Sequence, residues 1–103
     1  LLAAGCEALS GRLAELNEQE TSNVIYALGL LGYRPEAFLD AICLQMSGRL
    51  SEFKPQGISN AVYGLGLLGF KHCEFIRSVR AQVPSRLPEF TPQGVSNIAY
   101  SFG

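Results

Sequence analysis

The sequence predicts an all-α protein, an α-solenoid of tandem two-helix units with a period of 37 residues. Residues 12–16 (RLAEL) recur at 49–53 (RLSEF) and at 86–90 (RLPEF), in steps of 37 residues without an insertion. In addition, 17 of the 37 residues in 1–37 are identical to their counterparts in 38–74. A fixed period of this length indicates one supersecondary unit stacked on copies of itself, each burying a face that a lone copy would expose.

The repeat frame divides the chain into units 1–37, 38–74 and 75–103. The frame starts part-way into one unit and stops inside the second helix of another. We therefore expect residues 1–103 to be a single fragment of a longer α-solenoid, with unit 1–37 incomplete at its N-terminus and unit 75–103 partial.

The first helix of the middle unit is expected from about Pro35 to about Phe53. Proline suits a first helical turn, and apolar residues follow at spacings of one, three or four. Gly48-Arg49 interrupts this pattern, and residue pairs 11–12 and 85–86 do so in the other units. We expect a kink or short break at this point in every copy.

The second helix of each unit has clear start and stop signals. Residues 17–20 (NEQE) form a capping box, and Thr91 precedes a proline, whereas Lys54 is a poor N-cap. Gly32 and Gly69 suit left-handed caps, and each precedes an aromatic residue. Apolar residues lie all round the helix over 24–31, so we expect it to be buried on most sides.

Glycines recur within the second helix. Residues 64–69 (GLGLLG) fit the dinucleotide-binding fingerprint, but a helix ends there and no strand precedes it, so the match is a false positive. We expect Gly29, Gly66 and Gly103 to mark places where a neighbouring helix packs closely.

Composition argues against catalysis and metal binding. The three cysteines include no C-x-x-C pair, and Cys6 and Cys43 share one repeat position among apolar residues, as small core hydrophobes would. His72 beside Cys73 is too few ligands for zinc. No nucleophile–base pair or paired acids recur, so we expect no enzyme, no catalytic residues and no cofactor. No run of 18 apolar residues exists, so we expect no membrane partner.

Charge is nearly balanced but unevenly placed. The formal net charge is −1, with residues 1–40 acidic and residues 71–90 mildly basic. Arg12, Arg49 and Arg86 each precede a glutamate by three residues, which favours ion pairs within or between units over phosphate contact.

Polar residues form a stripe on each second helix. Residues 19, 23 and 26 (Gln, Asn, Tyr) recur at 56, 60, 63 and at 93, 97, 100. Two interpretations stay open: a buried polar ladder that bridges units, which we favour, and amides that face a ligand. Residues that discriminate among bases should differ between units, and the residues of this stripe do not. Better candidates are the positions of the same helix that vary from unit to unit, namely 20/57/94, 24/61/98 and 27/64/101.

The pattern P-Q-x-x-x-N-x-x-Y-x-x-G-x-x-G, preceded by R-L-x-E-F, resembles the octotricopeptide repeats of organellar RNA-binding proteins in green algae. Residues 55–69 carry it best and residues 91–103 carry its start. Tyrosine replaces the more usual tryptophan at 26, 63 and 100. The period of 37 is similar to that of the heptatricopeptide repeats of apicomplexan parasites, which often precede a RAP domain.

This resemblance implies a mitochondrial protein, or alternatively a plastid one, that holds single-stranded or irregular RNA in a concave groove. The RNA would be messenger or ribosomal, since some members of the family are components of mitochondrial ribosomes. Neighbouring proteins of a ribonucleoprotein complex would then be further partners. Small residues on the second helices would let these line the concave side. The alternative is a protein-binding α-solenoid scaffold subunit of a large complex, which the small net charge favours. The candidate RNA-binding residues are Gln19, Asn23, Gln56, Asn60, Gln93, Asn97, Lys54, Lys71, Arg77 and Arg80.

Overall fold

The protein is all-helical, as the sequence predicts. The computed structural model describes residues 11–102, and of Phe102 only the backbone; within this range there is no β-strand. The elements in chain order are η1 (Leu13–Glu15), α2 (Glu18–Leu31), α3 (Glu36–Ser47), η2 (Leu50–Glu52), α4 (Pro55–Leu68), α5 (Cys73–Gln82), η3 (Pro84–Glu89) and α6 (Pro92–Phe102), where η denotes a 3-10 helix.

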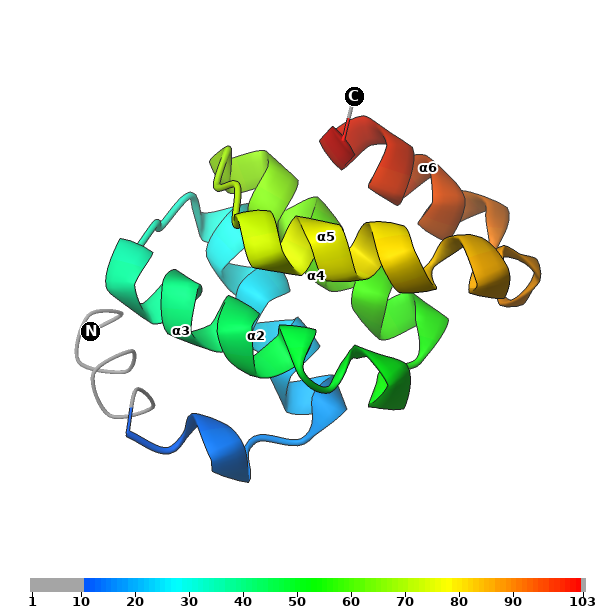
Figure 1. Cartoon of the computed structure of the whole chain (residues 1–103). Coiled ribbons are helices and arrows are strands. Elements are labelled where there is room, and N and C mark those ends of the chain that lie inside the picture. Colours follow the sequence, from blue (N-terminus) through cyan, green and yellow to red (C-terminus); the bar gives the residue numbers. More distant parts are fainter. Residues whose placement is uncertain (1–10, 103) are drawn as a thin grey trace.

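The helices form two layers. In one, α2 packs on α4 and α4 packs on α6; in the other, α3 packs on α5 (Figure 1). Large side chains that are less than 2% exposed fill the space between and beneath these helices, among them Ile25, Leu39, Met46, Phe53 and Phe75. Packing removes this apolar surface from water and thereby stabilises each helix pair.

The starts of α2 and α6 follow the expected caps. Asn17 Oδ1 accepts a hydrogen bond from the Glu20 amide at 2.8 Å, and Glu20 Oε1 accepts one from the Asn17 amide at 2.9 Å. Thr91 Oγ1 accepts from the Gly94 amide at 3.0 Å. One cap was not predicted: His72 Nδ1 accepts from the Phe75 amide at 3.1 Å and so caps α5. These bonds satisfy amides that have no partner within the helix.

The ends of α2 and α4 also agree with the sequence. Gly32 has φ 70° and Gly69 has φ 65°, the left-handed conformation that glycine adopts without strain. The following aromatic residue folds back in each case: the Tyr33 amide donates to Leu28 O, and the Phe70 amide donates to Leu65 O, both at 3.1 Å.

The break expected in the first helix is confirmed in the second and third units, while the residues before the expected break of the first unit lie outside the described range. Helix α3 stops at Ser47, and the chain continues through Arg49 (φ −126°, ψ 14°) into the separate 3-10 turn η2. In the next unit α5 stops at Gln82 and the longer η3 contains two prolines, which cannot donate helical hydrogen bonds. Leu50, which starts η2, is 1% exposed, so the break turns an apolar side chain into the core.

Helices α2, α4 and α6 approach closely at small residues. A Cβ atom added to Gly29 would lie 2.6 Å from Gly64 O, and one added to Gly64 would lie 2.7 Å from Ile25 O. One added to Gly66 would meet the Ser101 hydroxyl and lie 3.2 Å from Ser101 Cα. The expected close packing is thus confirmed at Gly29 and Gly66; Gly103 lies outside the described residues.

Burial differs from the expectation in one place and agrees in another. Leu30 and Leu31 are both 62% exposed, so α2 is not buried on most sides over 24–31. Cys43 is fully buried, and desolvation, with a smaller effect of the Asp40 carboxylate, raises the pKa of its thiol to about 12. Its role as a small core residue is confirmed, while Cys6 lies outside the described residues.

Candidate nucleic-acid interface

The recurring polar stripe lies opposite the core. On α4, residues 56, 60 and 63 share one side because their spacings of four and three match the helical turn. The fully or nearly buried residues Ile58, Val62 and Leu65 occupy the other side. We call the surface formed by this stripe on α2, α4 and α6 the amide–tyrosine face; it consists of Gln19, Asn23, Tyr26, Gln56, Asn60, Tyr63, Gln93, Asn97 and Tyr100.

The amides of this face pair within their own helices. Gln56 Nε2 donates to Asn60 Oδ1 at 2.9 Å, and Gln93 Nε2 donates to Asn97 Oδ1 at 3.2 Å. Gln19 and Asn23 are exposed. The favoured expectation of a buried polar ladder between units was therefore wrong: these amides lie at the surface, and their bonds run along a helix.

The tyrosines do connect the helices. The ring centroids of Tyr26 and Tyr63 are 6.3 Å apart, and those of Tyr63 and Tyr100 are 5.6 Å apart, with tilts of 40° and 49°. These distances are those of favourable aromatic pairs. The row leaves Tyr100 63% exposed, so a large part of its ring faces solvent.

Half of the candidate residues meet in one groove. A groove of about 330 Å³, which we call the α2–α4 groove, lies between the N-terminal halves of these helices. Its lining includes the candidates Gln19, Asn23, Lys54, Gln56 and Asn60. Farther along the layer, a hollow of about 260 Å³ is lined by Lys54 and Gln56 together with Glu89 and Thr91.

One residue of the groove was missed from the sequence. Glu18 lines it, in the first turn of α2, with a side chain that is 43% exposed. The available signal was its position in the repeat: its counterparts are Pro55 and Pro92, so only the first unit has a carboxylate there.

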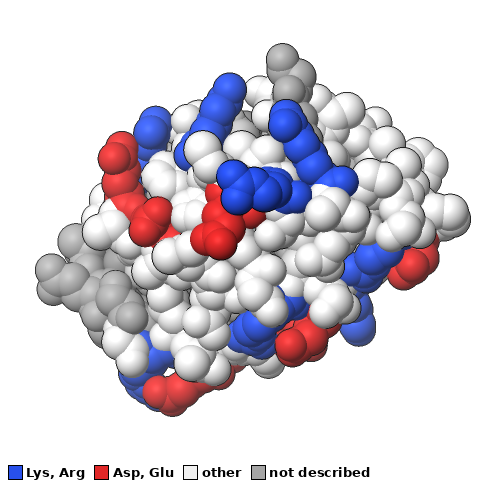
Figure 2. All heavy atoms as spheres, in the orientation of Figure 1, with Lys and Arg blue, Asp and Glu red and all other residues white. Residues whose placement is uncertain are grey.

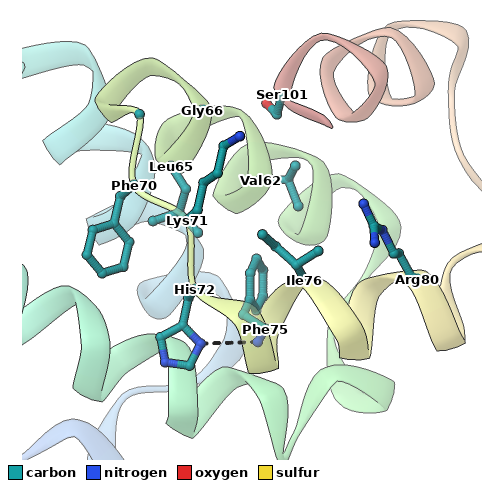
Figure 3. A pocket seen from close by; sticks show the side chains of 11 residues that line it. Val62, Leu65, Gly66, Phe70, Lys71, His72, Phe75, Ile76, Arg80 and Ser101 are labelled. Carbon is teal, nitrogen blue, oxygen red and sulfur yellow. Dashed lines mark hydrogen bonds between the residues drawn. The ribbon is translucent and has the colours of Figure 1, made fainter. Parts of the chain in front are cut away.

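The other basic candidates lie elsewhere. Lys71 and Arg80 line a pocket of about 180 Å³ formed by α4, α5 and Ser101 of α6 (Figure 3). Arg77 is exposed on α5, and Lys and Arg side chains gather over this helix and the loop before it (Figure 2). The structure thus divides the basic candidates between Lys54 in the α2–α4 groove and a cluster around α5.

The recurring arginines bind backbone carbonyls of the preceding unit. Arg49 Nη1 donates to Leu16 O at 3.1 Å, and Arg86 Nη2 donates to Phe53 O at 2.8 Å. Their glutamate partners, Glu52 and Glu89, are each 3.8 Å away. The expectation of a structural contact between units is confirmed at these two arginines, although the main acceptor is a carbonyl rather than a carboxylate.

Several of the variable positions on α4 and α6 lie at contacts between helices. A Cβ atom on Gly57 would lie 2.9 Å from Ser22 Oγ, and one on Gly94 would lie 2.7 Å from Ser59 Oγ. Ala61 is fully buried, and Gly64 contacts the backbone of α2. That these positions discriminate among ligands stays a prediction: the glycines at 57, 64 and 94 lie at contacts between helices, and Gly57 also lines the α2–α4 groove.

Residues 11–102 contain no group of three or more His, Cys, Asp or Glu side chains able to hold a metal ion. Within the same range, no helix is both long and apolar enough to span a bilayer. Comparison of the chain with protein-family models, curated protein sequences and solved structures gave no significant match.

Proposed function

We propose that the chain is part of a 37-residue-period α-solenoid that binds single-stranded RNA along its amide–tyrosine face. The solenoid is supported by contacts that recur at equal spacing. Arg49 and Arg86 each bind a carbonyl 33 residues earlier, and the two Ser–Gly contacts, 22 with 57 and 59 with 94, each span 35 residues. Units related in this way can continue indefinitely along one axis.

The observation that carries the RNA proposal is the exposure of this face opposite the core. After Gln56 and Asn60 pair with each other, the glutamine still offers its carbonyl oxygen and the asparagine its amino group. These groups match the mixed donors and acceptors of unstacked bases, and tyrosine rings provide surfaces on which bases stack. Lys54 adds a positive charge for a phosphate at the edge of the same face.

The resemblance of the repeat to octotricopeptide and heptatricopeptide proteins supports an organellar role. We place the protein in the mitochondrion, with the plastid as the alternative, acting on messenger or ribosomal RNA, for example within the mitochondrial ribosome. Short RNA would occupy the amide–tyrosine face, and longer RNA would also reach the basic cluster around α5.

The test is a binding titration with a fluorescent 12-nucleotide RNA of mixed sequence, monitored by fluorescence anisotropy and repeated at increasing salt concentrations. The double change Gln56→Ala and Asn60→Ala should weaken binding roughly tenfold and lower the free energy of unfolding by about 1 kcal/mol or less, because Gln56 is exposed, Asn60 is half-buried and their hydrogen bond joins only the two of them. The matched control removes two amides from the other layer, Gln45→Ala and Gln82→Ala, and should leave affinity unchanged. Equal affinity of both double variants would contradict the proposed face.

A protein-binding scaffold is the second candidate. The observation that favours it is the exposed pair Leu30 and Leu31 on α2, together with the net charge of −1. If the intact protein binds no RNA at 50 mM salt, where phosphate contacts are strongest, the scaffold function replaces RNA binding.

A further inference from the structure

We infer that the α2–α4 groove selects guanine at one position of a bound RNA, through the carboxylate of Glu18. The inference rests on the proposed RNA-binding function and adds a base preference to it. It starts from a difference between units: Glu18 lines this groove, whereas residues 55 and 92 at the same repeat position are prolines.

The surroundings of Glu18 favour one orientation of its carboxylate. It lies in the first turn of α2, where the partial positive charge of the helix end stabilises an anion. Its Oε2 atom is 3.8 Å from Nη2 of Arg49, which is itself held by its hydrogen bond to Leu16 O. One side of the carboxylate is thus near a fixed guanidinium, while the side chain remains 43% exposed in the groove.

The groove is large enough to hold a nucleobase, and it contains a further polar group. Its volume is about 330 Å³. Ser22, which also lines it, is 2% exposed, and within residues 11–102 its hydroxyl has no hydrogen-bond partner. The equivalent Ser59 hydroxyl donates to Pro55 O at 3.0 Å, so the two serines differ although they occupy the same repeat position. A buried polar group without a partner is unfavourable, and a bound polar ligand or water relieves that penalty.

The chemistry of a carboxylate distinguishes the four bases. An ionised carboxylate only accepts hydrogen bonds, and it has two oxygens side by side. Guanine presents two adjacent donors on its Watson–Crick edge, N1–H and the N2 amino group. Adenine and cytosine place a ring-nitrogen acceptor beside their amino group, and uracil has one N–H between two carbonyls. Guanine therefore forms two bonds to Glu18 without repulsion, which no other base does.

Lys54 in the same groove makes the carboxylate compatible with RNA. A glutamate alone would repel the phosphates that flank any base. With Lys54 lining the groove, a phosphate can lie at the ammonium group while the base lies at the carboxylate. The groove thus carries one charge of each sign, one for the backbone and one for the base.

The test uses four single-stranded 12-nucleotide RNAs that differ at one central base: guanine, inosine, adenine or uracil in a constant oligouridine context. Inosine retains N1–H and lacks the N2 amino group, so it removes one of the two proposed bonds. The wild-type protein should bind the guanine RNA roughly tenfold more tightly than the inosine and uracil RNAs. The variant Glu18→Gln should reduce this preference to within twofold.

The control is Glu20→Gln, which removes the same charge from the same helical turn. Glu20 does not line the groove, and glutamine preserves the capping box with Asn17. This control should retain the guanine preference, and both variants should show the same unfolding midpoint, slightly below that of the wild type. A wild-type protein that binds no RNA overturns the proposed function itself. RNA binding without guanine preference, a preference that survives Glu18→Gln, or an equal loss in Glu20→Gln overturns the role of Glu18 alone.

Discussion

The change Gly64→Ala tests the close approach of α2 and α4 most directly. The added methyl group would lie 2.7 Å from Ile25 O and 3.0 Å from Tyr26 Cα, and both are backbone atoms that cannot rotate away. To reach the 3.4 Å of ordinary contact, the helices must separate by about 0.7 Å at this point. Overpacking of this kind costs about 2–3 kcal/mol, whereas alanine gains about 1 kcal/mol in helix propensity over glycine. The expected net loss of stability is therefore about 1–2 kcal/mol.

Urea unfolding, monitored by circular dichroism, measures this loss of stability. In a domain of this size, a loss of about 1–2 kcal/mol lowers the melting temperature by roughly 5–10 °C. The control is Gly48→Ala. Gly48 has right-handed backbone angles, and the nearest atom to its added methyl group is 3.9 Å away. This variant should be as stable as the wild type or slightly more so. A Gly64→Ala protein that is as stable as Gly48→Ala would refute the argument that backbone contact fixes the helix separation.

Three further outcomes are expected. Arg86→Lys should destabilise the protein by about 1–2 kcal/mol in urea unfolding, because an ammonium cannot reproduce the paired contacts with the Phe53 and Leu50 carbonyls at 2.8 and 3.5 Å. Thiol labelling at pH 8, read by mass spectrometry, should modify the exposed Cys73 but should modify Cys43 only in denaturant. Burial raises the pKa of Cys43 to about 12, so the thiol of the unfolded chain ionises first. The free energy of unfolding should therefore fall as pH rises above about 9. Arg77→Gln combined with Arg80→Gln should weaken binding of a 30-nucleotide RNA and lower the slope of log affinity against log salt concentration by about one to two. A 6-nucleotide RNA should bind this double variant as it binds the wild type. An unchanged slope for the 30-nucleotide RNA would show that the cluster around α5 does not contact RNA.

Local signals explain why the helix boundaries could be predicted. The caps at Asn17 and Thr91 and the glycines at 32 and 69 act through hydrogen bonds between residues at most five apart, so the sequence around each contains the whole cause. The break after Ser47 was predictable for the same reason. The cap at His72 was not, because histidine is an uncommon N-cap. Its other ring nitrogen lies 3.1 Å from Asp40 Oδ1, a contact between helices that only the fold brings about.

The site was harder to predict because it depends on which side of a helix faces the core. A stripe of amides and a tyrosine fits either a buried ladder or a surface, and the sequence spacing is the same for both. The deciding contacts are between α2 and α4, where glycines at 57 and 64 admit the neighbouring helix and leave the amides outside. Glu18 and Lys54 come from different units, and the sequence does not indicate that they line one groove.

The close-contact positions also bear on the order in which the helices assemble. Gly29 meets Gly64, whereas Gly66 meets Ser101, so the two interfaces have different shapes. A serine in place of Gly64 would meet the Ile25 carbonyl, so α6 would pack on α2 less favourably than α4 does. Chains made of near-identical units are prone to pair the wrong copies, within one molecule or between two. The hydroxymethyl group of Ser101, one of several differences between α4 and α6, thus favours one order of stacking over the others.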